Sequence, residues 1–272
     1  MKYLFDYFLE FLDRDTISPD TRQKYYYRLR HFVTLHGQKT PDQITIQMIQ
    51  DYFDFKPDLA DPSKAMLRSC FHAFFAYCGL GDANPAKQIQ RFRETPRRVR
   101  LPQDDAVRLA LAEAVKMCAS ADVVHVRDGL IFTLAVVGGN RRGELRNLKL
   151  AELNEGLDSP EGNIYRVYTT GKTGESILRF TGFHVPHIRR YLKMRPQTVD
   201  PHVFINLRLG HQHYGRQLSL VGFNRARPKV CKRAGVPVIT YQELRRRLAT
   251  MVSRSVGVDV AAHVLNHSPH SG

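Results

Sequence analysis

Along residues 1–89, apolar and aromatic side chains recur every three or four positions, which is the spacing of helices with one buried face. Ser18-Pro19 is typical of a helix start, and Gly37 is typical of a helix end. The pattern predicts four helices, over residues 3–12, 18–37, 40–53 and 61–79. We expect these helices to pack together as one domain.

The apolar pattern lapses over residues 90–102, which are rich in arginine and predict a linker between two domains. It resumes in residues 103–272, where Leu130–Val137 is apolar enough to predict a buried helix. Further helices are expected over residues 103–118, 140–150, 186–194, 242–255 and 258–265, and a loop-rich region with short helices is expected over residues 202–240.

Between two of these helices the pattern changes to that of β-strands. Residues 163–170 and 175–180 are rich in Val, Tyr, Thr and other strand formers, and they flank the turn sequence Gly171-Lys172-Thr173-Gly174. We expect a small antiparallel β-hairpin with Lys172 at its turn, in a fold that is otherwise mainly α. A nucleotide-binding P-loop is excluded, because it needs a glycine where Arg166 stands and a helix after the turn.

Positive charge is concentrated in the last third of the chain. The formal net charge is +15, from 41 Lys and Arg against 26 Asp and Glu. Residues 179–254 hold 16 basic and 2 acidic side chains, and residues 90–100 hold five arginines. Such patches favour a polyanion, first nucleic acid and less often an anionic membrane surface. No apolar run is long enough to predict a membrane span, and acidic residues interrupt the N-terminus where a signal peptide would be apolar.

The cysteines and histidines suggest neither disulfides nor a metal site. None of the four cysteines forms a CxxC pair, so we expect reduced thiols in a cytoplasmic protein. Several histidines gather in the second half, but no cysteine or carboxylate joins them at ligand spacing, so we predict no metal. These histidines are His184, His187, His202, His211 and His213.

Two arginines far apart in the sequence are predicted to lie beside apolar helix faces. On a helix, Arg141 would share a face with Glu144 and Leu145, which would desolvate and orient its guanidinium. The residues Gly138-Gly139-Asn140 before it would expose backbone N–H groups to an anion. The alternative is that Arg141 only forms a structural ion pair at a helix start.

The second arginine, Arg245, would share a helix face with Ala249 and Val252. An inward arginine whose nearest carboxylate in sequence is Glu243 requires an anion. The adjacent Arg246 and Arg247 would be exposed, and we expect them to contact a DNA backbone without reading its sequence. Lys172 and His267 are further candidates, although taken singly each is also ordinary for a turn lysine and a helix cap.

Taken together, these motifs resemble the tyrosine recombinase (phage-type integrase) family over nearly the whole chain. Gly139–Leu145 is similar to the family's first-arginine motif, Gly171-Lys172 to its hairpin lysine, Leu244-Arg245-Arg246 to its His-x-Leu-Arg motif, and Leu265-Asn266-His267 to its Leu-Gly-His motif. The resemblance implies a SAM-like helical core-binding domain of residues 1–89, a linker of residues 90–102 and a mixed, mostly α catalytic domain of residues 103–272.

The resemblance also implies roles for particular residues. The catalytic set would be Arg141, Lys172, Gln242, Arg245 and His267. The two arginines would hold a phosphate, Lys172 would protonate the leaving 5′-oxygen, and His267 would hydrogen-bond the phosphate or assist the nucleophile. The linker arginines would contact DNA phosphates; they are Arg93, Arg97, Arg98 and Arg100.

Two features differ from the family pattern. Gln242 stands where the family has a histidine, and an amide positions a phosphate oxygen but cannot act as an acid or base. The family's nucleophilic tyrosine follows the motif that ends here at His267, whereas no tyrosine follows Tyr241 in this sequence. We expect that the segment with the nucleophile has been truncated.

The function implied by the resemblance is site-specific breakage and rejoining of double-stranded DNA through a 3′-phosphotyrosyl intermediate, in integration or excision of mobile genetic elements. No metal or other cofactor is implied. Four protomers would assemble on DNA, from a monomer or weak oligomer when free. One alternative is a catalytically inactive DNA-binding relative that acts as a regulator or architectural partner. Another, an RNA- or membrane-binding basic protein, predicts neither the inward arginines nor the two-domain layout.

Overall fold

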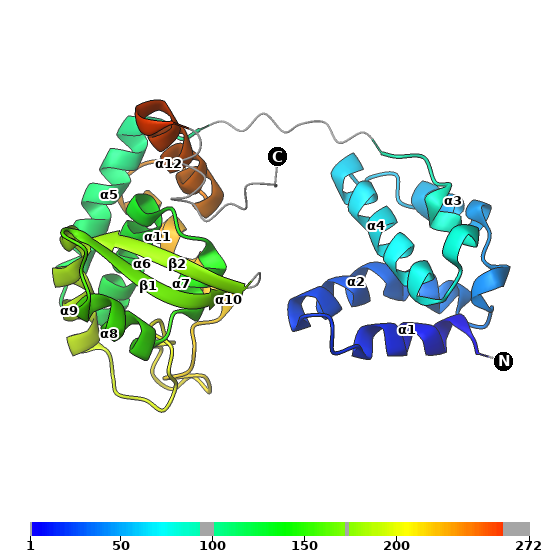
Figure 1. Cartoon of the computed structure of the whole chain (residues 1–272), viewed down its shortest axis with the longest axis horizontal. Coiled ribbons are helices and arrows are strands. Elements are labelled where there is room, and N and C mark those ends of the chain that lie inside the picture. Colours follow the sequence, from blue (N-terminus) through cyan, green and yellow to red (C-terminus); the bar gives the residue numbers. More distant parts are fainter. Residues whose placement is uncertain (1, 93–100, 172–173, 258–272) are drawn as a thin grey trace. The chain divides into compact units, whose positions relative to one another are not determined.

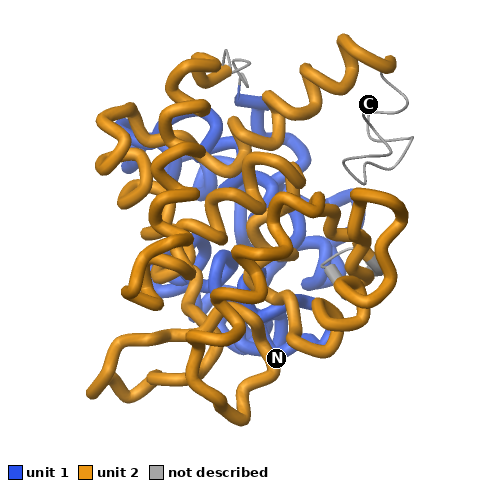
Figure 2. The backbone as a smooth tube through the Cα atoms, turned by 90° about the vertical axis from the view of Figure 1, so that its left-hand side faces the viewer, with its two compact units in different colours: residues 1–98 blue, residues 99–272 orange. Residues whose placement is uncertain are grey.

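The computed structural model describes residues 2–92, 101–171 and 174–257, and these form a mainly helical fold with one small antiparallel sheet, as predicted (Figure 1). The chain divides into two compact units, residues 1–98 and 99–272 (Figure 2). Some predicted site residues lie outside the described ranges: Arg93, Arg97, Arg98, Arg100, Lys172 and His267.

The first unit packs its helices around an aromatic core. Its elements are α1 (Leu4–Asp13), α2 (Pro19–His36), η1 (Pro41–Gln43), α3 (Ile46–Asp54), α4 (Asp61–Tyr77), η2 (Gly81–Ala83) and η3 (Pro85–Lys87). Phe11 and Phe74 are fully buried and meet edge to face, with ring centroids 5.3 Å apart. Ser18 caps α2, because its hydroxyl accepts a hydrogen bond from the Thr21 amide.

In the second unit, the buried helix α6 (Val123–Gly138) is the element around which the others pack (Figure 1). The other elements are α5 (Asp104–Cys118), α7 (Arg142–Asn147), α8 (Leu150–Asp158), β1 (Ile164–Gly171), β2 (Gly174–Thr181), η4 (Gly182–His184), α9 (Val185–Met194), α10 (Leu220–Asn224), α11 (Ala226–Arg233) and α12 (Tyr241–Val256). Gly129 allows the close approach of α5 to α6, since a Cβ there would lie 2.5 Å from the Ala114 carbonyl oxygen.

The predicted hairpin is present. Strands β1 and β2 pair antiparallel, in a register that runs from Ile164 opposite Thr181 to Gly171 opposite Gly174. Val167 and Leu178 face each other across the pair, and both are buried. Because side chains alternate along a strand, this register places one face of the hairpin against the core.

Two helix boundaries differ from the sequence prediction. Residues 140–150, predicted as one helix, are divided between α7 and the start of α8. The backbone at this break pairs with a distant segment: the Leu148 carbonyl accepts from the Val203 amide, and the Leu150 amide donates to the Pro201 carbonyl. Helix α6 begins at Val123 rather than near residue 130, because Asp122 caps it by accepting from the Val124 amide.

Within the described ranges, none of the helices combines the length and the apolar character that a membrane span requires.

Candidate active site

Helix α6 ends in a sharp turn that carries Arg141. Gly139 adopts a left-handed conformation with φ of 58°, which glycine takes readily and other residues rarely do. The chain then reverses direction, and Arg141 caps α7 with extended backbone, at φ −67° and ψ 140°. The prediction that Arg141 lies on a helix face was therefore wrong, since Arg141 comes one residue before the helix.

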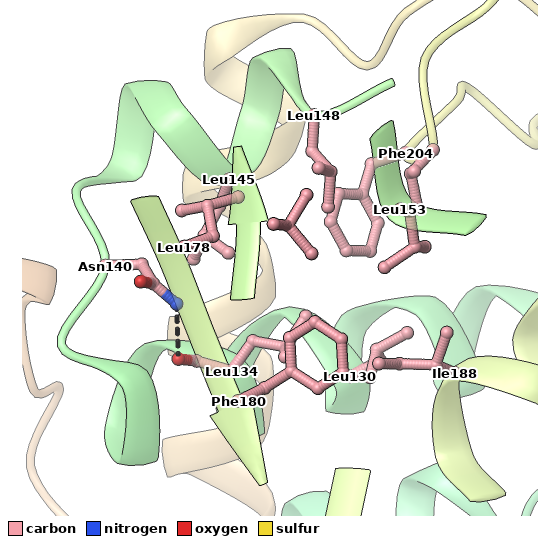
Figure 3. Close-up of a pocket in the computed structure, with 12 residues that line it drawn as sticks. Leu130, Leu134, Asn140, Leu145, Leu148, Leu153, Leu178, Phe180, Ile188 and Phe204 are labelled. Carbon is pink, nitrogen blue, oxygen red and sulfur yellow. Dashed lines mark hydrogen bonds between the residues drawn. The ribbon is translucent and has the colours of Figure 1, made fainter. Parts of the chain in front are cut away.

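Asn140 fixes this turn against the core. Its side chain is buried among apolar side chains, as Figure 3 shows. Its Nδ2 donates to the carbonyl oxygens of Leu134 and Arg179, and its Oδ1 accepts from the Arg179 amide, each at 3.4 Å. One side-chain amide thus pairs with both the N–H and the C=O of a residue in β2. These contacts involve the Asn140 side chain alone, and the presentation of backbone N–H groups to an anion by this segment stays a prediction.

Glu144 orients Arg141. The Glu144 carboxylate is buried, and its two oxygens accept from the Arg141 amide and from Arg141 Nη1, both at 2.8 Å. The oxygen that accepts from Nη1 also accepts from Ser176 Oγ of β2 at 2.8 Å. The ion pair of the alternative interpretation is therefore present. The Arg141 side chain nevertheless remains 42% exposed, so it is held by Glu144 and is still accessible to a ligand.

Arg245 reaches the same turn from α12. Its Nη1 donates to the Gly139 carbonyl oxygen at 2.6 Å. Burial, and next the neighbouring charge of Arg141, lower the pKa of Arg245 to about 10, although Glu144 opposes this shift. Arg245 is still cationic at neutral pH. Because the neighbouring cation disfavours the charge of Arg245, an anion bound between the two would stabilise that charge.

Both arginines line one open cleft with a volume of about 620 Å³. Gln242, which is exposed at the start of α12, also lines it. The structure thus brings together Arg141, Gln242 and Arg245 of the five predicted catalytic residues. The remaining lining residues are Asn140, Arg142, Gly143, Arg227, Thr240 and Tyr241.

The tyrosine that lines this cleft is not placed to act as a nucleophile. Tyr241 is 8% exposed, and its hydroxyl donates to the Phe223 carbonyl oxygen at 3.2 Å. Burial raises the pKa of Tyr241 well above its ordinary value. A phenol held in the core and hard to ionise does not attack a phosphate in the cleft.

Two further arginines of the cleft were not predicted as site residues. Arg142 donates from Nη1 to Asn224 Oδ1 at 3.3 Å. Arg227 lies over the Tyr241 ring, 4.7 Å from its centroid, and donates from Nη1 to the Ile239 carbonyl oxygen at 3.1 Å. Arg227 belongs to the region over residues 202–240 that was predicted to be rich in loops. Basic residues are frequent there, but the sequence shows no apolar periodicity that would distinguish Arg227 from the other arginines.

The two arginines that follow Arg245 in α12 differ in their exposure to solvent. Arg246 is exposed, as predicted. Arg247 is not, because its Nε pairs with Asp104 Oδ1 of α5 at 2.7 Å and its side chain is only 21% exposed. This ion pair joins α12 to the start of α5, and the prediction of an exposed Arg247 was wrong.

The histidine-rich region shows no metal site in the described part of the chain, where no three His, Cys, Asp or Glu side chains gather as ligands would. His202 instead contacts the Asp200 carboxylate through Nδ1 at 2.7 Å. Asp200 also accepts from the Gln217 amide, so these residues stabilise a loop.

A sequence profile of the phage integrase family matches residues 102–271. Among solved structures, a lambda integrase dimer bound to a COC′ core site is similar with a TM-score of 0.67 and 17% identity, over 99% of this chain and 96% of that one. The Tn1549 transposon integrase in complex with transposon right end DNA gives a TM-score of 0.67 and 14% identity, over 98% and 92%. At such identities the likeness shows a shared fold. No curated protein matches the sequence.

Proposed function

Since the chain belongs to the phage integrase family of site-specific DNA recombinases, we propose that it breaks and rejoins DNA strands through a 3′-phosphotyrosyl intermediate. A tyrosine oxygen attacks a backbone phosphorus, the bond to the 5′-oxygen breaks, and that oxygen takes up a proton. The 5′-hydroxyl of a second strand then attacks the phosphotyrosine and releases the tyrosine. Tyr241 is held away from this step, so the proposal requires that another tyrosine be delivered to the cleft.

The observation that carries the proposal is the convergence of Arg141 and Arg245 in one cleft. Guanidinium groups bind phosphate oxygens in a planar, two-point fashion. Each of these two is oriented by a contact inside the protein, Arg141 by Glu144 and Arg245 by the Gly139 carbonyl. Cations fixed before the reaction stabilise the charge that develops on a pentacoordinate phosphorus without having to reorganise.

The other proposed roles follow the family resemblance. Lys172 would protonate the leaving 5′-oxygen, and His267 would hydrogen-bond the phosphate or assist the nucleophile. Gln242 lines the cleft and would donate a hydrogen bond to a phosphate oxygen from its amide. We assign no metal or other cofactor to this reaction, because the arginines supply the positive charge.

Double-stranded DNA is the proposed partner. Residues 179–254 carry 16 basic and 2 acidic side chains, and the exposed Arg246 lies on the helix that borders the cleft. Lambda integrase has been solved as a tetramer bound to a Holliday junction. We propose that this chain likewise assembles as four protomers on two duplexes and that it acts in the cytoplasm. The proposed phosphate contacts are Arg93, Arg97, Arg98, Arg100 and Arg246.

The test is a comparison of duplex binding with covalent adduct formation. A duplex selected from a random pool by binding is incubated with the protein, and the DNA–protein adduct that survives denaturant is quantified. We expect Arg141→Ala or Arg245→Ala to lower the adduct by about 10²–10³-fold while duplex affinity stays within a few-fold. Arg208→Ala, an exposed arginine outside the cleft lining, is the control. Wild-type amounts of adduct in either cleft variant would overturn the proposal.

One observation favours a second function, that of a noncatalytic DNA-binding relative. Gln242 occupies the cleft with a side chain that cannot transfer a proton. The same experiment separates the two functions. Tight binding of a selected duplex without any adduct supports the noncatalytic protein, and an adduct that depends on Arg141 and Arg245 supports the recombinase.

A further inference from the structure

Arg227 is a cation of the cleft that the proposed reaction does not use. It lies in the first turn of α11 and lines the same cleft as Arg141 and Arg245. Within the described ranges no carboxylate forms an ion pair with it. An arginine that is partly buried without a counter-charge is costly unless an anion joins it.

The guanidinium of Arg227 is fixed before any ligand binds. Its Nη1 donates to the Ile239 carbonyl oxygen, and its Cζ lies over the Tyr241 ring. Its Nε is buried and has no hydrogen-bond partner among the described residues. The contact with the Tyr241 ring and the hydrogen bond from Nη1 already restrict the Arg227 side chain. The side chain therefore loses little conformational entropy when a phosphate binds.

The helix that carries Arg227 is itself anchored. Lys229 donates to Asp128 of α6 at 2.7 Å, and Asp128 is fully buried. Asp128 also accepts from Nε and Nη2 of Arg127, whose Nη1 donates to the Ile205 carbonyl oxygen. Asp128 thus pairs with both Arg127 and Lys229 and holds α11 against α6, so that Arg227 presents its charge to the cleft at a defined place.

We propose that Arg227 binds a second backbone phosphate, adjacent on the same DNA strand to the phosphate held by Arg141 and Arg245. This assignment rests on the proposed function. Tyr241, over which Arg227 lies, precedes Arg245 by one helical turn, a rise of about 6 Å. The backbone positions of Tyr241 and Arg245 on α12 are therefore about as far apart as neighbouring phosphates along a strand. A cleft of about 620 Å³ has room for both. Arg227 would therefore set the register of the strand, which places the scissile phosphate between the other two arginines.

The test is the salt dependence of duplex binding by the wild type and by Arg227→Gln, Arg227→Lys and Arg208→Gln. Anisotropy of a labelled duplex gives the affinity at each NaCl concentration, and thermal melting gives the stability of each variant. Loss of one phosphate contact lowers the slope of log affinity against log salt by about 0.9. We expect this change in Arg227→Gln, so that a ten-fold rise in salt weakens its binding about 8-fold less than that of the wild type. Arg227→Lys should keep the wild-type slope, because it keeps the charge, and so should Arg208→Gln.

Three results would overturn the inference. If the wild type has a steep slope and Arg227→Gln has the same slope, Arg227 does not bind a second phosphate. The proposed function would be unaffected by this result. If Arg227→Gln and Arg227→Lys lose the same amount of slope and the same amount of melting temperature, Arg227 only stabilises the segment before α12. A wild type that does not bind duplex DNA overturns the proposed function together with the inference.

Discussion

Arg245 donates a hydrogen bond from Nη1 to the carbonyl oxygen of Gly139, the left-handed residue two positions before Arg141. The contact spans 106 positions of sequence and joins α12 to the turn that ends α6. A carbonyl acceptor orients a guanidinium without removing its net charge. The backbone that positions one arginine of the cleft therefore also positions the other.

Replacing Arg245 by lysine should separate charge from geometry. Arg245→Lys keeps a cation, but one ammonium cannot hold the Gly139 carbonyl and also present a planar pair of donors to a phosphate. We expect a loss of at least about ten-fold in affinity for orthovanadate, about 1.4 kcal/mol, measured by the vanadate-dependent rise in melting temperature. Arg246→Lys, on the exposed side of the same helix, should bind vanadate like the wild type. Equal affinities in the two variants would contradict the role of Arg245.

The buried Glu144 should matter for stability as well as for Arg141. Glu144→Ala leaves the Arg141 guanidinium and the Ser176 hydroxyl without this acceptor, and Ser176→Ala removes one charged hydrogen bond. We expect the free energy of unfolding to fall by about 1–3 kcal/mol in Ser176→Ala, and by more in Glu144→Ala. Urea unfolding measures both, with the exposed Ser159→Ala as the control. If Ser176→Ala were as stable as Ser159→Ala, the hairpin would not be coupled to Arg141 through Glu144.

Asn140 should be required for the turn, although it lies in an otherwise apolar environment (Figure 3). In Asn140→Ala, the N–H and C=O of Arg179 lose the amide that pairs with them. An unsatisfied buried backbone group costs about 1–3 kcal/mol, so unfolding should require correspondingly less urea. Asn163→Ala removes an exposed acceptor of the Gly182 amide and should cost less. A larger effect at Asn163 than at Asn140 would mean that the turn does not depend on this amide.

Stability should fall in mildly acidic solution because of His184. Its ring is fully buried, with Nε2 3.3 Å from the Thr133 carbonyl oxygen and Nδ1 3.3 Å from the Thr181 amide. Burial lowers the pKa of His184 below its ordinary value. As the pH falls through about 6.5, the unfolded chain takes up a proton that the folded protein does not, and the free energy of unfolding decreases.

The measurement is the free energy of unfolding of the wild type and of His184→Gln between pH 7.5 and pH 5. The difference between the two proteins should shift in favour of the variant as the pH falls, since glutamine does not titrate. His36 and His187 also have lowered pKa values because of burial, but they are present in both proteins. A difference that is the same at every pH would exclude His184 as a cause of acid sensitivity.

The sequence predicted those parts of the fold that local periodicity determines. The hairpin followed from strand formers on both sides of a glycine-flanked turn, and the helices of the first unit followed from their apolar spacing and caps. The break between α7 and α8 could not be predicted, because it depends on pairing between Leu148 and Val203, which lie far apart in sequence. Arg141 was predicted on a helix face but lies at the N-cap of α7, because the left-handed Gly139 ends α6 just before it.

The sequence also predicted some residues of the candidate site and missed others. The spacing of the motifs predicted Arg141 and Arg245 as site residues, and the structure places both in one cleft. Arg227 could not be singled out, because its position depends on the Lys229–Asp128 contact and on the Tyr241 ring. The exposure of Arg247 was predicted wrongly, since the sequence does not show that Arg247 of α12 pairs with Asp104 of α5.

The convergence of Arg141 and Arg245 on one phosphate is tested most directly by a crystal structure of the protein soaked with tungstate, whose position anomalous scattering reveals. We predict a tungstate in the cleft, within hydrogen-bond distance of guanidinium nitrogens from both arginines. Tungstate bound by only one of them, or a cleft that remains empty while the anion occupies other sites, would contradict this claim.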